Sequence, residues 1–176
     1  MENCRIRVVL DHKQDIFRDI IVTPENTFQE IYETIIKAFD FSGQELASFY
    51  TSNENWDQGR EIAMMDMGFA EEPEMQQQEV LTMSGTRVED LLKGRGDRMI
   101  LVYDFMRMWC FYLEVVELNE ELTEKTPFIA YSFGNAPAED SRVEPGLPDD
   151  DEDDHQDIES EIDDMMNDFG IDEDDL

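Results

Sequence analysis

The densest apolar and aromatic run of the chain, residues 98–118, restricts the fold more than any other stretch. As a membrane span it would place four charged side chains in hydrocarbon at a cost of about 2.5–3.5 kcal/mol each, namely Asp104, Arg107, Glu114 and Glu117. We therefore exclude a span. Apolar residues instead alternate in two arms separated by residues 106–108, and both faces of each arm are largely apolar. The run predicts a hairpin near the centre of a sheet.

Charge and composition exclude several classes of function. The 176 residues carry a formal charge of −32, from 45 acidic and 13 basic side chains. Such a chain repels phosphate backbones and anionic lipid, so we expect no direct nucleic-acid binding and no membrane partner. The first residues contain no apolar signal segment, which makes the cytoplasm the expected location. With two cysteines and two histidines, we expect no disulfide framework, no zinc site and no cofactor.

The remaining elements follow from local patterns. Residues 5–10 and 16–22 predict an opening hairpin, and residues 46–52 and 62–67 predict two further strands. A capping box at Thr27 and Glu30 predicts the start of a long helix that ends near residues 40–43. A second box at residues 86–89 predicts a short helix ended by a left-handed Gly94. After Pro127 the pattern is irregular, and we expect a final ordered segment that wraps the domain.

These elements predict an α+β fold: a mixed sheet of hairpins with one long and one short helix on one face, in a β-grasp-like arrangement. We expect a globular domain at residues 1–138. Residues 139–176 contain 19 acidic residues and one basic residue, which predicts a largely disordered acidic tail.

Apolar residues recur at helical spacing inside this tail, which predicts a short helix at residues 157–169. The pattern is typical of a segment that becomes ordered on a basic protein partner with an apolar groove, although a plain solubility tail explains it equally well. The partner-binding candidates are Ile158, Ile162, Met165, Met166 and Phe169.

Few residues offer catalytic chemistry. No glycine-rich phosphate loop, serine-hydrolase motif or zinc-protease motif occurs in the sequence. The only carboxylates that we consider for acid–base or metal chemistry are Asp104, Glu139 and Asp140. Such a site requires all three in one cleft.

Two short motifs resemble a known family. Tyr103, Asp104 and Phe105 followed by Trp109, together with the segment 136–140, resemble the plasmid pRiA4b ORF-3-like family, also labelled transposon passenger TnpR-like proteins. The resemblance covers roughly residues 5–140, leaves the acidic tail outside, and indicates a divergent, Bacteroides-type member of a mobile-element family.

This chain departs from the family pattern at polar positions. Where the family has Gly, Asp and His, this sequence has Met106, Arg107 and Phe111, and the family's Pro-Pro-Glu-Asp-Cys ending here has Ala138 and Ser141. The resemblance thus implies that any chemistry of the polar cluster is lost. The TnpR-like label implies a serine recombinase, which the acidic charge argues against.

Our leading hypothesis is a non-enzymatic cytoplasmic protein-interaction module. One alternative is a degenerate or metal-dependent hydrolase that uses Asp104, Glu139 and Asp140. A second alternative is a nucleic-acid mimic that occupies a basic site on a DNA-binding protein.

Overall fold

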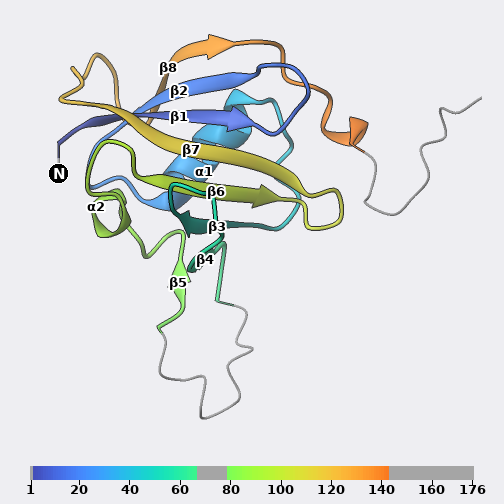
Figure 1. The fold of residues 1–176 in the computed structure, drawn as a ribbon, viewed down its shortest axis with the longest axis horizontal. Helices are drawn as coiled ribbons and strands as arrows, with labels where there is room; N and C mark the ends of the chain where they lie inside the picture. The colour runs from blue at the N-terminus through green and yellow to red at the C-terminus, as the bar shows by residue number, and fades with distance from the viewer. Residues whose placement is uncertain (1, 67–78, 143–176) are drawn as a thin grey trace, which may run out of the picture. The chain divides into compact units, whose positions relative to one another are not determined.

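The computed structural model describes residues 2–66 and 79–142, and it has the predicted α+β class. Its strands form one eight-stranded sheet in the order β5-β4-β3-β6-β7-β1-β2-β8 (Figure 1). All strand pairs are antiparallel except β4 and β5. The elements are β1 (Cys4–Leu10), β2 (Phe17–Val22), α1 (Phe28–Ala38), β3 (Ala47–Ser52), β4 (Glu61–Ala63), β5 (Leu81–Thr82), α2 (Val88–Leu91), β6 (Arg98–Tyr103), β7 (Trp109–Leu118), β8 (Phe128–Phe133) and a 3-10 turn, η1 (Glu139–Ser141).

The predicted central hairpin is confirmed. Strands β6 and β7 pair from Arg98 opposite Glu114 to Tyr103 opposite Trp109, and they occupy the middle of the sheet. One face of β7 is fully buried, because every second residue from Trp109 to Val115 contacts the core. Residues 104–108 turn the chain, and Asp104 and Met108 adopt left-handed backbone angles, with φ of 59° and 57°.

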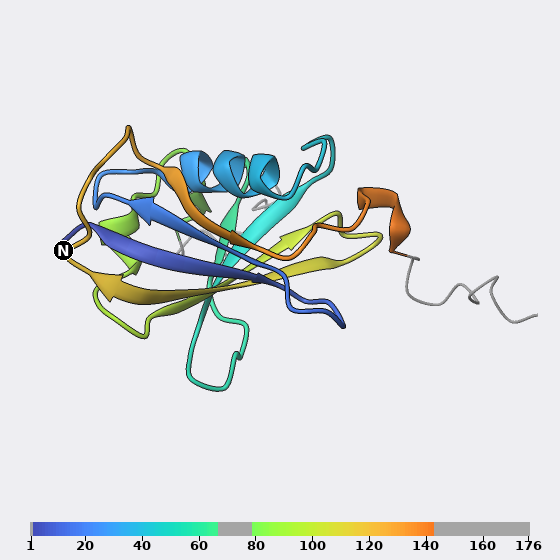
Figure 2. The same cartoon turned by 90° about the horizontal axis from the view of Figure 1, so that it is seen from above.

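Helix α1 begins at the predicted capping box. The Thr27 hydroxyl accepts the Glu30 N–H at 3.2 Å, and the Glu30 carboxylate accepts the Thr27 N–H at 2.8 Å. Figure 2 shows α1 lying along one face of the sheet. Its apolar stripe packs there against the same face of β6 and β7. Within the described ranges, no helix is long and apolar enough to cross a membrane.

The predicted cap of the second helix is wrong in detail. The Thr86 carbonyl accepts the Phe28 N–H at 3.0 Å, so Thr86 belongs to the contact with α1 instead of capping α2. The cap is Arg87, whose N–H donates to the Asp90 carboxylate at 2.8 Å. The predicted left-handed cap at Gly94 is also wrong, because α2 ends at Leu91 with Leu92 as its C-cap. The left-handed glycine in the following loop is Gly96, with φ of 92°.

The segment after Pro127 forms an edge strand. Strand β8 pairs with β2 through a register shift between Asp19 and Ile20, which explains its irregular pattern. Arg18, only 7% exposed, fixes this edge. Its guanidinium donates to the carbonyls of Phe133 at 2.8 Å and of Ala38, at the end of α1, at 3.2 Å.

Candidate functional site

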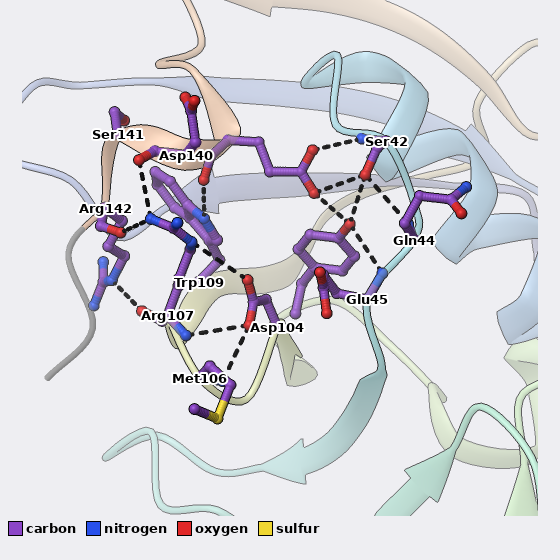
Figure 3. Close-up of polar contacts among 12 residues, drawn as sticks. Ser42, Gln44, Glu45, Asp104, Met106, Arg107, Trp109, Asp140, Ser141 and Arg142 are labelled. Carbon is purple, nitrogen blue, oxygen red and sulfur yellow. Dashed lines mark hydrogen bonds and ion pairs between the residues drawn. The ribbon is translucent and has the colours of Figure 1, made fainter.

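The three carboxylates proposed from sequence meet in one pocket at the turn end of the central hairpin. The pocket has a volume of about 460 Å³ and is open to solvent on one side. Figure 3 shows its polar contacts, which join the hairpin turn, the loop after α1 and the segment around η1. Its lining residues are Ser42, Glu45, Asp104, Arg107, Glu139 and Asp140.

Glu139 is held by three donors. Its carboxylate accepts the Tyr103 hydroxyl at 2.5 Å, and it accepts the Ser42 hydroxyl at 3.0 Å and the Ser42 N–H at 2.8 Å. Burial opposes ionisation of Glu139, but these hydrogen bonds outweigh it and lower the pKa of the carboxyl. Glu139 is therefore an ionised structural acceptor at neutral pH.

Asp104 shapes the turn that carries it. One carboxylate oxygen accepts the N–H groups of Met106 at 3.1 Å and Arg107 at 3.2 Å, and the other lies 3.8 Å from the Arg107 guanidinium. An aspartate that caps its own turn tolerates the left-handed backbone that this residue adopts.

Residues 138–142, which we call the C-terminal latch, close over the hairpin turn. Arg107 donates to the carbonyls of Asp140 at 2.9 Å and Arg142 at 2.5 Å, and Arg142 donates back to the Arg107 carbonyl at 2.8 Å. The Trp109 indole N–H donates to the Glu139 carbonyl at 3.0 Å. The expected boundary between residues 138 and 139 thus falls inside a packed segment. The residues of the predicted tail helix lie outside the described residues.

The family-like motif residues are therefore joined to one another. Tyr103 and Trp109 from the first motif bind Glu139 from the second, and both rings are buried in the core. Phe105, in the turn, is instead 43% exposed. Phe111, at the position of the family histidine, is fully buried. Met106 stands where the family has glycine. Its backbone is not left-handed, so a side chain is accommodated at this position.

The contacts of these carboxylates hold the hairpin turn and the C-terminal latch together. The oxygens of Asp104 and Glu139 are engaged by donors of the same chain. Across residues 2–66 and 79–142, no three His, Cys, Asp or Glu side chains are grouped closely enough to hold a metal ion. The second tryptophan is remote from the pocket, because Trp56 packs on Tyr112, on the opposite face of β7 from Trp109.

An exposed apolar surface beside this pocket was missed by sequence reasoning. We call it the methionine cluster: Leu46, Met64, Met65, Phe105 and Met106. The first four line a small hollow of about 100 Å³, and Met106 follows Phe105 in the turn. Met106 is 65% exposed, Met65 50% and Phe105 43%. Three separate segments supply these residues, so no single stretch of sequence signals the cluster.

Comparisons with known proteins place the chain in a family without assigning it an activity. The structure is similar to the crystal structure of MM3350, a protein of unknown function from Methanosarcina mazei Go1, with a TM-score of 0.64 and 17% identity. The match covers 81% of this chain and 75% of that one, and it supports the fold alone. A search of curated proteins found no match.

The sequence model described as plasmid pRiA4b ORF-3-like protein matches residues 2–175. This range corrects the coverage expected from the motifs, because it includes the acidic C-terminal segment that the motif resemblance leaves outside. The chain therefore belongs to the plasmid pRiA4b ORF-3-like protein family.

Proposed function

We propose that this protein is a non-enzymatic interaction module that binds a basic, amphipathic segment of a partner protein through the methionine cluster. The observation that carries the proposal is the exposure of this apolar cluster among carboxylates in a chain of net charge −32. Asp104 and Glu139 hold the turn and the latch that present the cluster.

The exposed side chains of the methionine cluster suit an amphipathic partner. Methionine is flexible and polarisable, so surfaces rich in it adapt to partners of varied shape. Phe105 supplies a rigid ring beside Met65 in the same hollow. Apolar side chains of an amphipathic helix, repeated at i, i+3 or i+4 and i+7, fit such a surface.

Charge supports a basic partner over a neutral one. Glu61 lines the hollow itself, and Glu45 and Asp104 line the pocket next to it. Glu45 and Glu61 are exposed. A partner rich in Lys and Arg is attracted to this surface at long range, and its association slows as salt screens the field. Residues 139–176 contribute to the net charge of −32 whether or not their predicted helix forms.

A cytoplasmic location belongs to the same proposal. Cys4 and Cys110, the only cysteines of the chain, are both free thiols. Free cysteines are typical of a reducing compartment.

Methyl NMR of labelled methionines tests where a basic segment binds. The probe is a synthetic amphipathic helix of leucine and lysine, and the control is the same helix with glutamate in place of lysine. We expect the lysine helix to shift the methyl signals of Met65 and Met106. The buried Met83 and Met99 serve as internal references and should stay unchanged. Absence of shifts, or equal shifts with the glutamate helix, would overturn the proposal.

The hydrolase alternative keeps one supporting observation, since Asp104, Glu139 and Asp140 do share a pocket. It requires Asp104 and Glu139 to exchange their internal donors for a metal or a water. Calorimetric titration of the full chain with Mg²⁺ and with Mn²⁺ tests this alternative. Stoichiometric binding that Glu139→Gln abolishes would favour the hydrolase, and our proposal predicts no such binding.

A further inference from the structure

Strand β8 lies at one end of the sheet and is paired along one side. Its neighbour in the strand order is β2, and Figure 1 shows β8 as the outermost strand. Because alternate residues of a strand turn their N–H and C=O groups to opposite sides, half of these groups in β8 point away from β2. Among residues 2–66 and 79–142, no other segment forms backbone hydrogen bonds with that side. The β8 edge therefore offers donors and acceptors to a further strand.

Strand β8 lacks most of the features that block the edges of sheets. Short length, charged side chains, proline and bulges are the usual means of preventing an edge from pairing. The six residues of β8 include no charged side chain and no proline, whereas β5, at the other end of the sheet, has only two residues. The register shift opposite Asp19 and Ile20 skips Ala130, which forms a bulge, but residues 131–133 pair regularly with β2. This part of the edge remains straight enough to accept a partner.

Two aromatic side chains of β8 are about half exposed. Tyr131 is 50% exposed and Phe133 47%. Both rings pack on Phe17 of β2, with centroids 5.9 Å and 5.3 Å from the Phe17 centroid. Arg7 covers Phe17 in turn, since its guanidinium carbon lies 4.3 Å from the centroid of that ring. A strand paired with β8 would set its own side chains directly beside these two supported aromatic rings.

A groove lies between α1 and the start of β8, on the other face of the sheet. Its volume is about 290 Å³, and its lining includes residues 125–127 and two pairs of opposite charges. These charges are Glu30 and Glu33 against Lys37 and Lys125, so they sum to zero. Ile129 of β8 points to the same side, because it lies opposite the buried Ile20, and it is 40% exposed. Polar, uncharged side chains of a partner strand suit this mixed surface.

We propose that the β8 edge binds an extended, uncharged segment of another protein as a ninth strand of the sheet. Main-chain hydrogen bonds attach the segment, and apolar side chains at every second position contact Tyr131 and Phe133. The positions between them carry polar side chains that face the groove beside α1. Charge favours this partner over a second copy of the chain, because two chains of charge −32 repel each other and an uncharged segment is not repelled.

The strand-binding edge and the methionine cluster are separate surfaces, so neither proposal depends on the other. The methionine cluster adjoins β3, β4 and the hairpin turn, and four strands of the sheet lie between β3 and β8. Main-chain pairing with an uncharged segment changes little with salt. Binding of a basic segment to the methionine cluster weakens as salt screens the charges. Failure of one proposal is therefore distinguishable from failure of the other.

Amide NMR of the full chain tests the edge. The probe is a heptapeptide of alternating threonine and valine with blocked ends, at about 1 mM, where even a contact with a dissociation constant near 1 mM is about half occupied. We expect shifted signals and slower hydrogen exchange at alternate amides of β8, because these N–H groups gain acceptors. The control peptide has the same side chains with its interior amide nitrogens methylated. It cannot donate main-chain hydrogen bonds and should not bind.

Three variants separate the aromatic contact from the rest of the chain. Tyr131→Ser should weaken binding of the probe by roughly fivefold, which is the upper size of a contact between an aromatic and a β-branched side chain on paired strands. Tyr131→Phe keeps the ring and should bind as the wild type does. Met106→Ser, in the methionine cluster, should also leave the affinity unchanged.

Four results would overturn the inference. The probe leaves the β8 amides unchanged at about 1 mM. The methylated control peptide binds as tightly as the probe. Met106→Ser weakens binding more than Tyr131→Ser does, which would place the peptide at the methionine cluster. Sedimentation of the free chain shows a dimer that Tyr131→Ser removes, which would assign the edge to a second copy.

Discussion

Two buried tyrosines with ring centroids 6.5 Å apart differ in what their hydroxyl groups bind, so the same substitution should change stability in opposite directions. The Tyr103 hydroxyl donates to the Glu139 carboxylate at 2.5 Å and lies 3.4 Å from both the Ser42 hydroxyl and the Glu45 N–H. The Tyr32 hydroxyl is buried and has no hydrogen-bond partner among residues 2–66 and 79–142. Burial raises the pKa of Tyr32 to about 12, so its hydroxyl stays protonated near neutral pH.

The magnitudes follow from these contacts. A hydrogen bond to a charged group contributes about 1.5–3 kcal/mol, so Tyr103→Phe should lower the free energy of unfolding by about 2 kcal/mol. A buried hydroxyl without a partner costs about 1–3 kcal/mol, so Tyr32→Phe should raise the free energy of unfolding by about 1 kcal/mol. In a domain of about 150 residues, 1 kcal/mol shifts the melting temperature by about 2–4 °C.

Urea unfolding of the full chain measures both effects, with each variant compared with the wild type at an unchanged slope. Each substitution removes one oxygen from a buried phenol ring, so the pair controls for volume and hydrophobicity. Destabilisation by Tyr32→Phe equal to that by Tyr103→Phe would refute the assignment of a structural role to the Tyr103–Glu139 contact.

Three further predictions concern the latch and the β8 edge. Folding lowers the pKa of Glu139, so its carboxylate stabilises the fold at pH values above the ordinary carboxyl pKa of 4.5, and this stabilisation is lost as the pH falls through the lowered pKa. Glu139→Gln should therefore make the free energy of unfolding less dependent on pH in the acidic range. Arg18→Leu should cost about 2 kcal/mol and speed amide exchange in β8, since the carbonyls that it binds lose a charged donor. Gly134→Ala should cost more than about 1 kcal/mol in thermal unfolding, because its φ is 77° and a Cβ would lie 2.6 Å from the Asp15 carbonyl oxygen.

Regular patterns made the centre of the fold predictable. The alternation in residues 98–118 identified strands β6 and β7, because each has a fully buried face set by the period of two. Thr27 and Glu30 located the start of α1, since a capping box uses only local contacts. Both predictions succeeded because the patterns that define these elements lie within a few residues of one another in the sequence.

Elements that depend on distant contacts were predicted less well. The register shift beside Asp19 interrupts β8, so its residues show no simple alternation. Thr86 matches a cap in sequence, but its carbonyl binds the start of α1 and leaves the capping role to Arg87. Neither outcome has a signal in the local sequence.

The site was predictable only in part. Sequence reasoning selected Asp104, Glu139 and Asp140 as the only carboxylates to consider, and these do line one pocket. Their donors could not be predicted, because Ser42 comes from the loop after α1, which shows no motif of its own. The methionine cluster was missed for the same reason, since its exposure results from how three segments meet at one end of the sheet.

The most direct test of the proposed function is the affinity of the full chain for the leucine–lysine helix, measured by calorimetry in the wild type and in the double variant Phe105→Ser, Met106→Ser. We predict binding that weakens with salt and a loss of affinity of at least about tenfold, or about 1.4 kcal/mol, in the double variant. The control Val9→Ser, on β1 and outside the residues that line either pocket, should bind as the wild type does. Equal affinity of the double variant and the wild type would contradict the assignment of the methionine cluster as the binding surface.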